Sequence, residues 1–204
     1  QSDAITKQIP FWSDVLQHSS PSLPFDHPQG DNLQKWTRVV THQLSTEETR
    51  KLLQETVQRY RTHIDELLIT ALALAISRWT RQRAFYLHLE GHGREEIDAR
   101  FDLSRTVGWF TNMYPVWIDL KESASKGAAL REVKEQVRRV PQRGLGYGLL
   151  RYLQAEPVLP SEPDVPIGFN YLGQFAAGEG TESLFTGDAS ESPGIQMDPE
   201  SMRP

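Results

Sequence analysis

Apolar and polar residues alternate along residues 84–90, which read Ala-Phe-Tyr-Leu-His-Leu-Glu. This period of two predicts a half-buried strand whose apolar residues share one face, while His88 and Glu90 share the other. Glycines follow at positions 91 and 93, where the chain can turn. The pattern therefore places the Glu90 carboxylate at the end of a strand, on its polar side, and functional residues often occupy such positions.

The same reasoning predicts further strands and several helices. Alternation predicts strands at residues 36–44, 113–120 and 167–172. Apolar residues at helical spacing predict helices over residues 9–16, 45–59, 64–78 and 126–140, and a short helix that ends near 154. Alternating strands and helices indicate a mixed α/β layer structure.

A glycine-rich stretch, Gly144-Leu-Gly-Tyr-Gly148, follows the last long helix. It lacks the spacing of a dinucleotide-binding loop and comes after a helix instead of a strand, so a nucleotide site is disfavoured. We predict a tight turn in which the glycines adopt positive φ.

Composition narrows the class of protein. A net charge of −5 over 204 residues argues against a nucleic-acid surface, and no apolar run approaches the roughly 20 residues of a membrane helix. The absence of cysteine excludes thiolate catalysis and fits a cytoplasmic setting. Because the chain begins at Gln1 without an initiator methionine, we expect it to be a piece of a longer protein.

Residues 90–94 bring a carboxylate, an imidazole and a guanidinium close together, but a metal usually needs three or four ligands and few are local. From periodicity alone, a strand-end turn with solvated charges is as plausible as a functional site. Asn170 and Tyr171 lie at the end of another predicted strand, where the pattern alone favours a satisfied polar pair. For His88 it favours a packed or exposed strand residue over a catalyst.

Five motifs occur in a fixed order along the chain. They are Asp65-x-Leu-Leu68, Glu90-Gly-His-Gly-Arg-Glu95, Arg105-Thr-Val-Gly-Trp-Phe-Thr111 with Tyr114-Pro115, Gly144-Leu-Gly-Tyr-Gly148, and Phe169-Asn-Tyr-Leu-Gly173. In this order they resemble the epimerization domains of nonribosomal peptide synthetases, which belong to the condensation-domain superfamily. The resemblance covers roughly residues 8 to 204.

The resemblance implies an α/β chloramphenicol acetyltransferase-like fold, in which two subdomains meet at a channel. This chain resembles the C-terminal subdomain, a two-layer sandwich with a mixed sheet. The implied division is a helix and linker from the first subdomain (1–32), the C-terminal subdomain (33–175) and a flexible polar loop (176–204). The family's His-His-x-x-x-Asp-Gly motif is absent, since no two of the six histidines are adjacent, so the chain is expected to be inactive alone.

The reaction that the resemblance implies is inversion at Cα of an aminoacyl or peptidyl thioester by deprotonation and reprotonation. Glu90 matches one proton-transfer group, and the second histidine of the absent motif would be the other. Asn170 and Tyr171 match positions implicated in activity. Arg94 also matches, and ion pairing that positions the loop is as plausible for it as direct contact.

The implied partners are the first subdomain and a peptidyl carrier protein, whose phosphopantetheine arm holds the substrate; no cofactor of the domain's own is implied. Two alternatives remain at this point. One is a condensation domain, which shares the fold and forms a peptide bond, although the motifs at 90–94 and 169–173 favour epimerization. The other is a non-catalytic scaffold on which a carrier protein docks.

Overall fold

The computed structural model describes residues 3–19, 23–31, 33–95 and 102–173. The chain divides into two units, one made of residues 1–24 and 47–171 and the other of residues 25–46 and 172–204. The candidate site lies in the first unit. The flexible loop expected at 176–204 lies outside the described residues, and the division at residues 32 and 175 stays a prediction.

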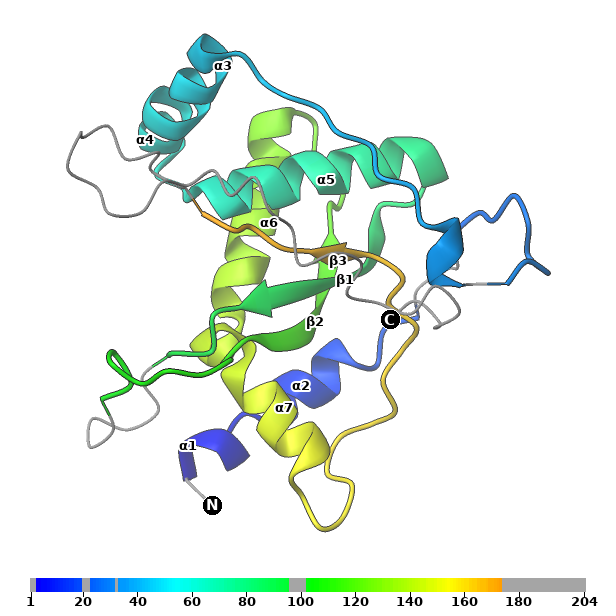
Figure 1. Cartoon of the computed structure of the whole chain (residues 1–204), viewed down its shortest axis with the longest axis vertical. Coiled ribbons are helices and arrows are strands. Elements are labelled where there is room, and N and C mark those ends of the chain that lie inside the picture. Colours follow the sequence, from blue (N-terminus) through cyan, green and yellow to red (C-terminus); the bar gives the residue numbers. More distant parts are fainter. Residues whose placement is uncertain (1–2, 20–22, 32, 96–101, 174–204) are drawn as a thin grey trace. The chain divides into compact units, whose positions relative to one another are not determined.

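Three strands form a mixed sheet in the order β2-β1-β3 (Figure 1). Strand β1 (Ala84–Gly91) is antiparallel to β2 (Asn112–Asp119) and parallel to β3 (Gly168–Phe169). The first two strands confirm the alternation in the sequence. The third is only two residues long, shorter than the predicted 167–172, because few of its backbone groups pair with β1.

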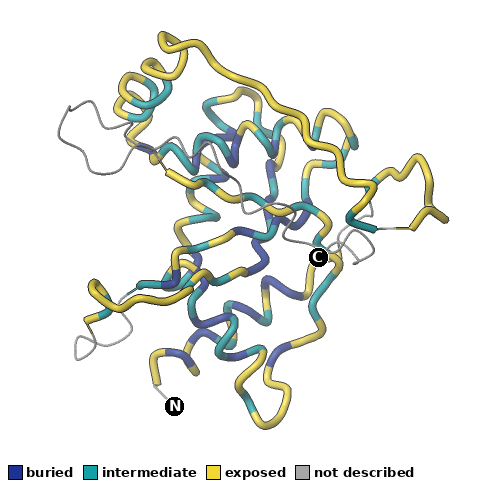
Figure 2. Tube along the Cα trace, viewed as in Figure 1, coloured by how far each residue is buried: buried dark blue, intermediate teal, exposed yellow. Residues whose placement is uncertain are grey.

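One face of β1 and β2 builds the core of this unit (Figure 2). Side chains on facing positions meet there in three buried pairs: Phe85 with Ile118, Leu87 with Val116, and Leu89 with Tyr114. Full burial of each such side chain contributes roughly 1.5–3 kcal/mol. This core fixes β1 rigidly up to Leu89 and so determines where the next residue, Glu90, emerges.

The helices follow the predicted pattern closely. The predicted ones are α2 (Ile9–Val15), α5 (Ile64–Thr80), α6 (Lys126–Arg139) and α7 (Leu145–Tyr152), and the short α1 (Asp3–Thr6) was not predicted. The predicted 45–59 helix is α3 (Thr46–Arg50) and α4 (Val57–Tyr60), joined by the π-helical stretch η2 (Lys51–Thr56). In the view of Figure 1 the strands lie between α5 and the pair α2 and α7.

An ion pair between the buried Glu66 and the partly exposed Arg138 joins α5 to α6. The Glu66 carboxylate is almost fully buried and accepts hydrogen bonds from Arg138 Nε at 2.5 Å, Thr62 Oγ1 at 2.5 Å and the backbone N of His63 at 2.8 Å. Burial raises the pKa of Glu66, but the hydrogen bonds from Arg138, Thr62 and His63 outweigh it and leave the pKa below its usual value. The carboxylate therefore stays ionised inside the unit.

The glycine-rich stretch differs from its prediction. Gly146 and Gly148 lie inside α7, while Gly144 alone of the three has positive φ, at 78°. It ends the short 3₁₀-helix η3 (Pro141–Gly144). Gly146 is needed for packing, because a Cβ there would lie 2.1 Å from Oε1 of Gln8. The prediction of positive φ is confirmed for Gly144 and wrong for Gly146 and Gly148, which are helical; at Gly146 a close contact, not a turn, selects glycine.

The strand predicted at 36–44 is also wrong. Residues 34–36 form the 3₁₀-helix η1 (Gln34–Trp36), and residues 37–45 have no regular structure. Among the described residues, no strand is paired with residues 37–45. Val39 and Val40 are 85% and 93% exposed, which shows that alternation alone does not make a strand without a surface to bury it.

Candidate functional site

Glu90 and Asn170 lie side by side at the same end of the sheet. Leu89 of β1 is paired with Phe169 of β3, and because these strands are parallel the next residue on each is also adjacent. Asn170 Nδ2 donates a hydrogen bond to Oε2 of Glu90 at 2.6 Å. Two residues 80 positions apart in the sequence thus form one polar group.

The Glu90 side chain is exposed, so its carboxylate is accessible from outside this unit. Among the residues that the structure describes, no other hydrogen bond reaches this carboxylate. One oxygen is thus oriented by the amide, and the other accepts no hydrogen bond from a described residue.

Tyr171 follows Asn170 in the chain and is half-buried. Within the described part of the protein, its hydroxyl makes no hydrogen bond with either Glu90 or Asn170. The structure therefore brings together two of the four candidate residues and places Tyr171 beside them without a direct polar contact.

The turn after Glu90 requires glycine at position 93. Gly93 has φ of +67°, and a Cβ there would lie 1.5 Å from the carbonyl oxygen of Phe110. Because this obstacle is backbone, only glycine lets the chain turn there against the segment that enters β2. A Cβ on Gly91 would lie 2.6 Å from Oδ1 of Asn112, the end of a side chain that can move aside.

Arg94, the fourth candidate, is directed to a loop instead of to Glu90. Its guanidinium donates to the carbonyl oxygens of Leu103 at 2.6 Å, Thr106 at 2.8 Å and Gly108 at 3.4 Å. It also lies 4.3 Å from the centre of the Phe110 ring, a cation–π distance. These are the contacts of a side chain that organises the 103–110 loop.

Arg94→Lys is expected to loosen this loop without removing the charge. A lysine ammonium cannot reproduce the planar fork that reaches three carbonyls, so hydrogen exchange of the 103–110 backbone amides should speed up by about tenfold. Arg105→Lys is the matched control, because Arg105 is exposed in the same loop. Equal exchange rates in the two variants would show that Arg94 does not hold the loop.

The remaining polar side chains of the motif contact each other. His92 Nε2 lies 3.0 Å from Oε1 of Glu95, and Arg143 Nε approaches the same oxygen at 3.7 Å. His92 Nδ1 accepts a hydrogen bond from the backbone N of Arg94 at 3.0 Å. Across the described ranges, no group of three or more His, Cys, Asp or Glu side chains has the geometry to hold a metal ion.

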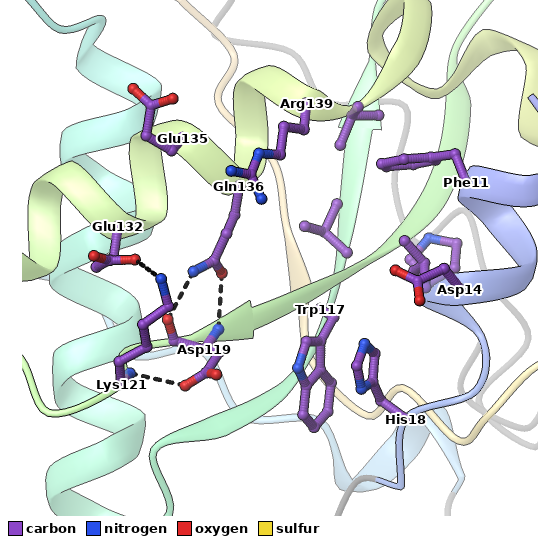
Figure 3. Close-up of a pocket in the computed structure, with 14 residues that line it drawn as sticks. Phe11, Asp14, His18, Trp117, Asp119, Lys121, Glu132, Glu135, Gln136 and Arg139 are labelled. Atoms are coloured by element: carbon purple, nitrogen blue, oxygen red, sulfur yellow. Dashed lines mark hydrogen bonds and ion pairs between the residues drawn. The ribbon is translucent and has the colours of Figure 1, made fainter.

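A pocket of about 260 Å³ opens elsewhere, among α2, β2 and α6 (Figure 3). His18 stacks on Trp117 in it, with ring centres 4.6 Å apart. Lys121 Nζ binds Glu132, and the Gln136 amide bonds the backbone N and O of Asp119 at 2.8 and 2.7 Å. Many of the polar side chains that line this pocket are thus paired with each other, and Glu90 is not among the lining residues. We therefore do not assign the candidate site to this pocket.

One polar cluster beside the site has no recognisable sequence pattern. His88 Nε2 lies 3.0 Å from Oε1 of Glu162, which comes 74 residues later in the connection between α7 and β3. His88 precedes Glu90 by two residues and shares its face of β1. Spacing could not reveal this contact, because a long loop brings Glu162 back to the strand.

Comparisons with known proteins identify the family of this chain. The family model described as "Condensation domain" matches residues 1–198. Over 177 residues, 85% of the chain, the sequence is 45% identical to a linear gramicidin synthase of Brevibacillus parabrevis, of which it spans 3%. The crystal structure of the epimerization domain from the third module of tyrocidine synthetase B superposes with a TM-score of 0.80 at 36% identity, covering 86% of this chain and 40% of that one.

The mixed α/β sheet and its helices thus define a chloramphenicol acetyltransferase-like fold of the condensation and epimerization type. The chain belongs to the condensation-domain family of nonribosomal peptide synthetases. It spans a small part of the synthetases that it matches. None of the helices in the described residues is long and apolar enough to cross a membrane.

Proposed function

We propose that this chain forms part of an epimerization domain, which inverts Cα of an aminoacyl or peptidyl thioester from the L to the D configuration. The thioester would be held on the phosphopantetheine arm of a carrier protein. The observation that carries the proposal is the exposed Glu90 carboxylate, which the Asn170 amide orients at 2.6 Å at the end of the sheet.

The chemistry needs two proton-transfer groups. The thioester carbonyl acidifies the Cα proton, so a base on one face can remove it while an acid on the other face returns a proton. Glu90 is the group that this chain supplies. Its partner is the second histidine of the His-His-x-x-x-Asp-Gly motif, which the resemblance assigns to the first subdomain.

The enolate that forms after deprotonation carries negative charge on the thioester oxygen, and hydrogen-bond donors stabilise such charge. The Asn170 amide has two N–H groups, and Glu90 accepts one of them. We assign the second N–H, together with the Tyr171 hydroxyl, to this developing charge. The domain needs no cofactor in this scheme.

Similarity favours epimerization over condensation. The tyrocidine synthetase epimerization domain is 36% identical with a TM-score of 0.80. The first condensation domain of the CDA synthetase is 21% identical with a TM-score of 0.52, a likeness of fold alone. Peptide-bond formation is the second candidate function, because the matching family model is described as a condensation domain.

A loaded carrier protein distinguishes the candidate functions. The synthetase that contains this chain is incubated with its carrier loaded with an L-aminoacyl group, and the thioester is then hydrolysed for chiral chromatography. Epimerization gives a mixture of D and L forms without a second carrier. Product that appears only when a second loaded carrier is added identifies condensation, and an unchanged L form identifies a scaffold.

A further inference from the structure

We infer that His88 and Glu162 form a clamp that positions Asn170 against Glu90. The inference rests on the proposed function for its catalytic consequence, but its structural part stands on the contacts alone. It makes His88 and Glu162 positioning residues, since they act through Asn170 and not on the substrate.

Strand β3 is too short to fix its own place. It consists of Gly168 and Phe169, and only these two residues are paired with β1 in the ladder. The backbone N of His88 donates to the carbonyl oxygen of Ile167 at 2.9 Å, which is one of the few hydrogen bonds that form this ladder. With so few hydrogen bonds, a shift of β3 by one residue along β1 would cost little free energy. Such a shift would move the Asn170 side chain to the other face of the sheet.

The clamp supplies the missing constraint. His88 Nε2 holds the Glu162 carboxylate at 3.0 Å, five residues before Ile167. The backbone N of His88 also donates to the carbonyl oxygen of Ile167, so His88 contacts the segment that leads into β3 at two points, Glu162 and Ile167. A shift of β3 along β1 would have to break the side-chain contact as well as the ladder.

A second side chain holds the same connection from α7. Arg151 Nη1 donates to the carbonyl oxygen of Pro160 at 2.6 Å, and its Nε lies 3.9 Å from Oε2 of Glu162. Leu159 beside it is buried in the core. The connection is therefore anchored to both α7 and β1 before it enters β3.

The charges at the clamp agree with its geometry. The hydrogen bond from His88 lowers the pKa of Glu162 more than burial raises it, so the carboxylate is ionised when it accepts this bond. Burial, and then the nearby Glu162 charge, raise the pKa of Tyr147 on α7, which keeps that hydroxyl protonated. The Arg151 cation and the neutral Tyr147 hydroxyl thus lie near the Glu162 carboxylate that contacts His88.

The test uses the intact synthetase with Glu162→Ala and Asn170→Ala, singly and combined. If the clamp acts through Asn170, Glu162→Ala lowers kcat of epimerization by about tenfold and changes KM for the loaded carrier by less than about twofold. In the Asn170→Ala background, Glu162→Ala lowers kcat by less than about twofold, because the Asn170 side chain that Glu162 helps to position is already absent. Glu162→Gln, which keeps an acceptor for His88, restores most of kcat.

Glu156→Ala is the matched control, since Glu156 is exposed in the same connection. Equal loss from Glu156→Ala, or a full tenfold loss from Glu162→Ala in the Asn170→Ala background, overturns the inference.

Hydrogen exchange of the 165–171 backbone amides provides a readout that does not depend on catalysis. Glu162→Ala should accelerate this exchange by about tenfold, and Asn170→Ala should not. Accelerated exchange in a protein that leaves the L form untouched refutes the epimerase function but keeps the clamp. Unchanged exchange in an active epimerase refutes the clamp alone.

Discussion

Glu90→Gln is expected to lower the rate of epimerization by the intact synthetase by about 10³-fold, within the range of general acid–base catalysis. Glutamine has nearly the same shape, and its carbonyl oxygen can still accept the 2.6 Å hydrogen bond from Asn170. It cannot take up or release a proton at the pH of the reaction. The substitution therefore removes the proton transfer while it keeps the geometry.

Two measurements check this expectation. The D/L ratio on the carrier protein reports inversion, and incorporation of solvent deuterium at Cα reports deprotonation by itself. Glu122→Gln is the control, because Glu122 is an exposed glutamate in the same unit, on the turn after β2. Full epimerization by Glu90→Gln would remove Glu90 from the mechanism. Loss of inversion with retained deuterium exchange would show that Glu90 delivers the proton and does not remove it.

The strand that carries Glu90 could be predicted because its pattern is strong and its environment is simple. Phe85, Leu87 and Leu89 alternate with less apolar residues, and a core face exists to bury them. The prediction placed Glu90 on the exposed side of the strand end, which the structure confirms. Local periodicity is sufficient where one rigid element determines the position of a side chain.

The contact between Glu90 and Asn170 could not be predicted, because it depends on how β3 aligns with β1. Parallel neighbours are joined by long connections, and nothing in the sequence of residues 153–167 encodes the alignment. The contacts that fix it, His88 with Glu162 and Arg151 with Pro160, become visible only in three dimensions. The family resemblance named Asn170 as a candidate, but it gave no physical reason for its place.

Arg94 shows the limit of carrying over a role from a motif. The motif marked it as a candidate site residue, with loop positioning as an alternative. Its three carbonyl contacts and the Phe110 ring lie on the 103–110 loop. A long, flexible side chain near a strand end can adopt several conformations, and for Arg94 the carbonyl oxygens of the 103–110 loop determine which one is adopted.

Arg138→Met is expected to lower the free energy of unfolding by about 2 kcal/mol at pH 7. Loss of one partner of a fully buried pair costs roughly 3–5 kcal/mol, and the value here is reduced because the Arg138 side chain is 43% exposed. The Glu66 carboxylate keeps its bonds from Thr62 and His63 but loses its counter-charge. Urea titrations followed by tryptophan fluorescence measure the difference.

The pH dependence separates this electrostatic loss from a packing defect. In the native protein the Glu66 pKa is lowered by its partners, so its stabilisation is present above the unfolded pKa of about 4.3 and is lost as pH falls through the folded value. In Arg138→Met, fewer hydrogen bonds oppose the effect of burial on Glu66, so the Glu66 pKa rises. The variant is therefore destabilised at a pH at which the Glu66 carboxylate is ionised. The difference in the free energy of unfolding between the native protein and Arg138→Met should therefore decrease as pH falls from 7 towards 4. Arg139→Met is the control, because Arg139 is an exposed neighbour on α6, and it should lower the free energy of unfolding by less than about 0.5 kcal/mol. If the difference for Arg138→Met stays constant across this pH range, lost packing and not the ion pair explains its effect.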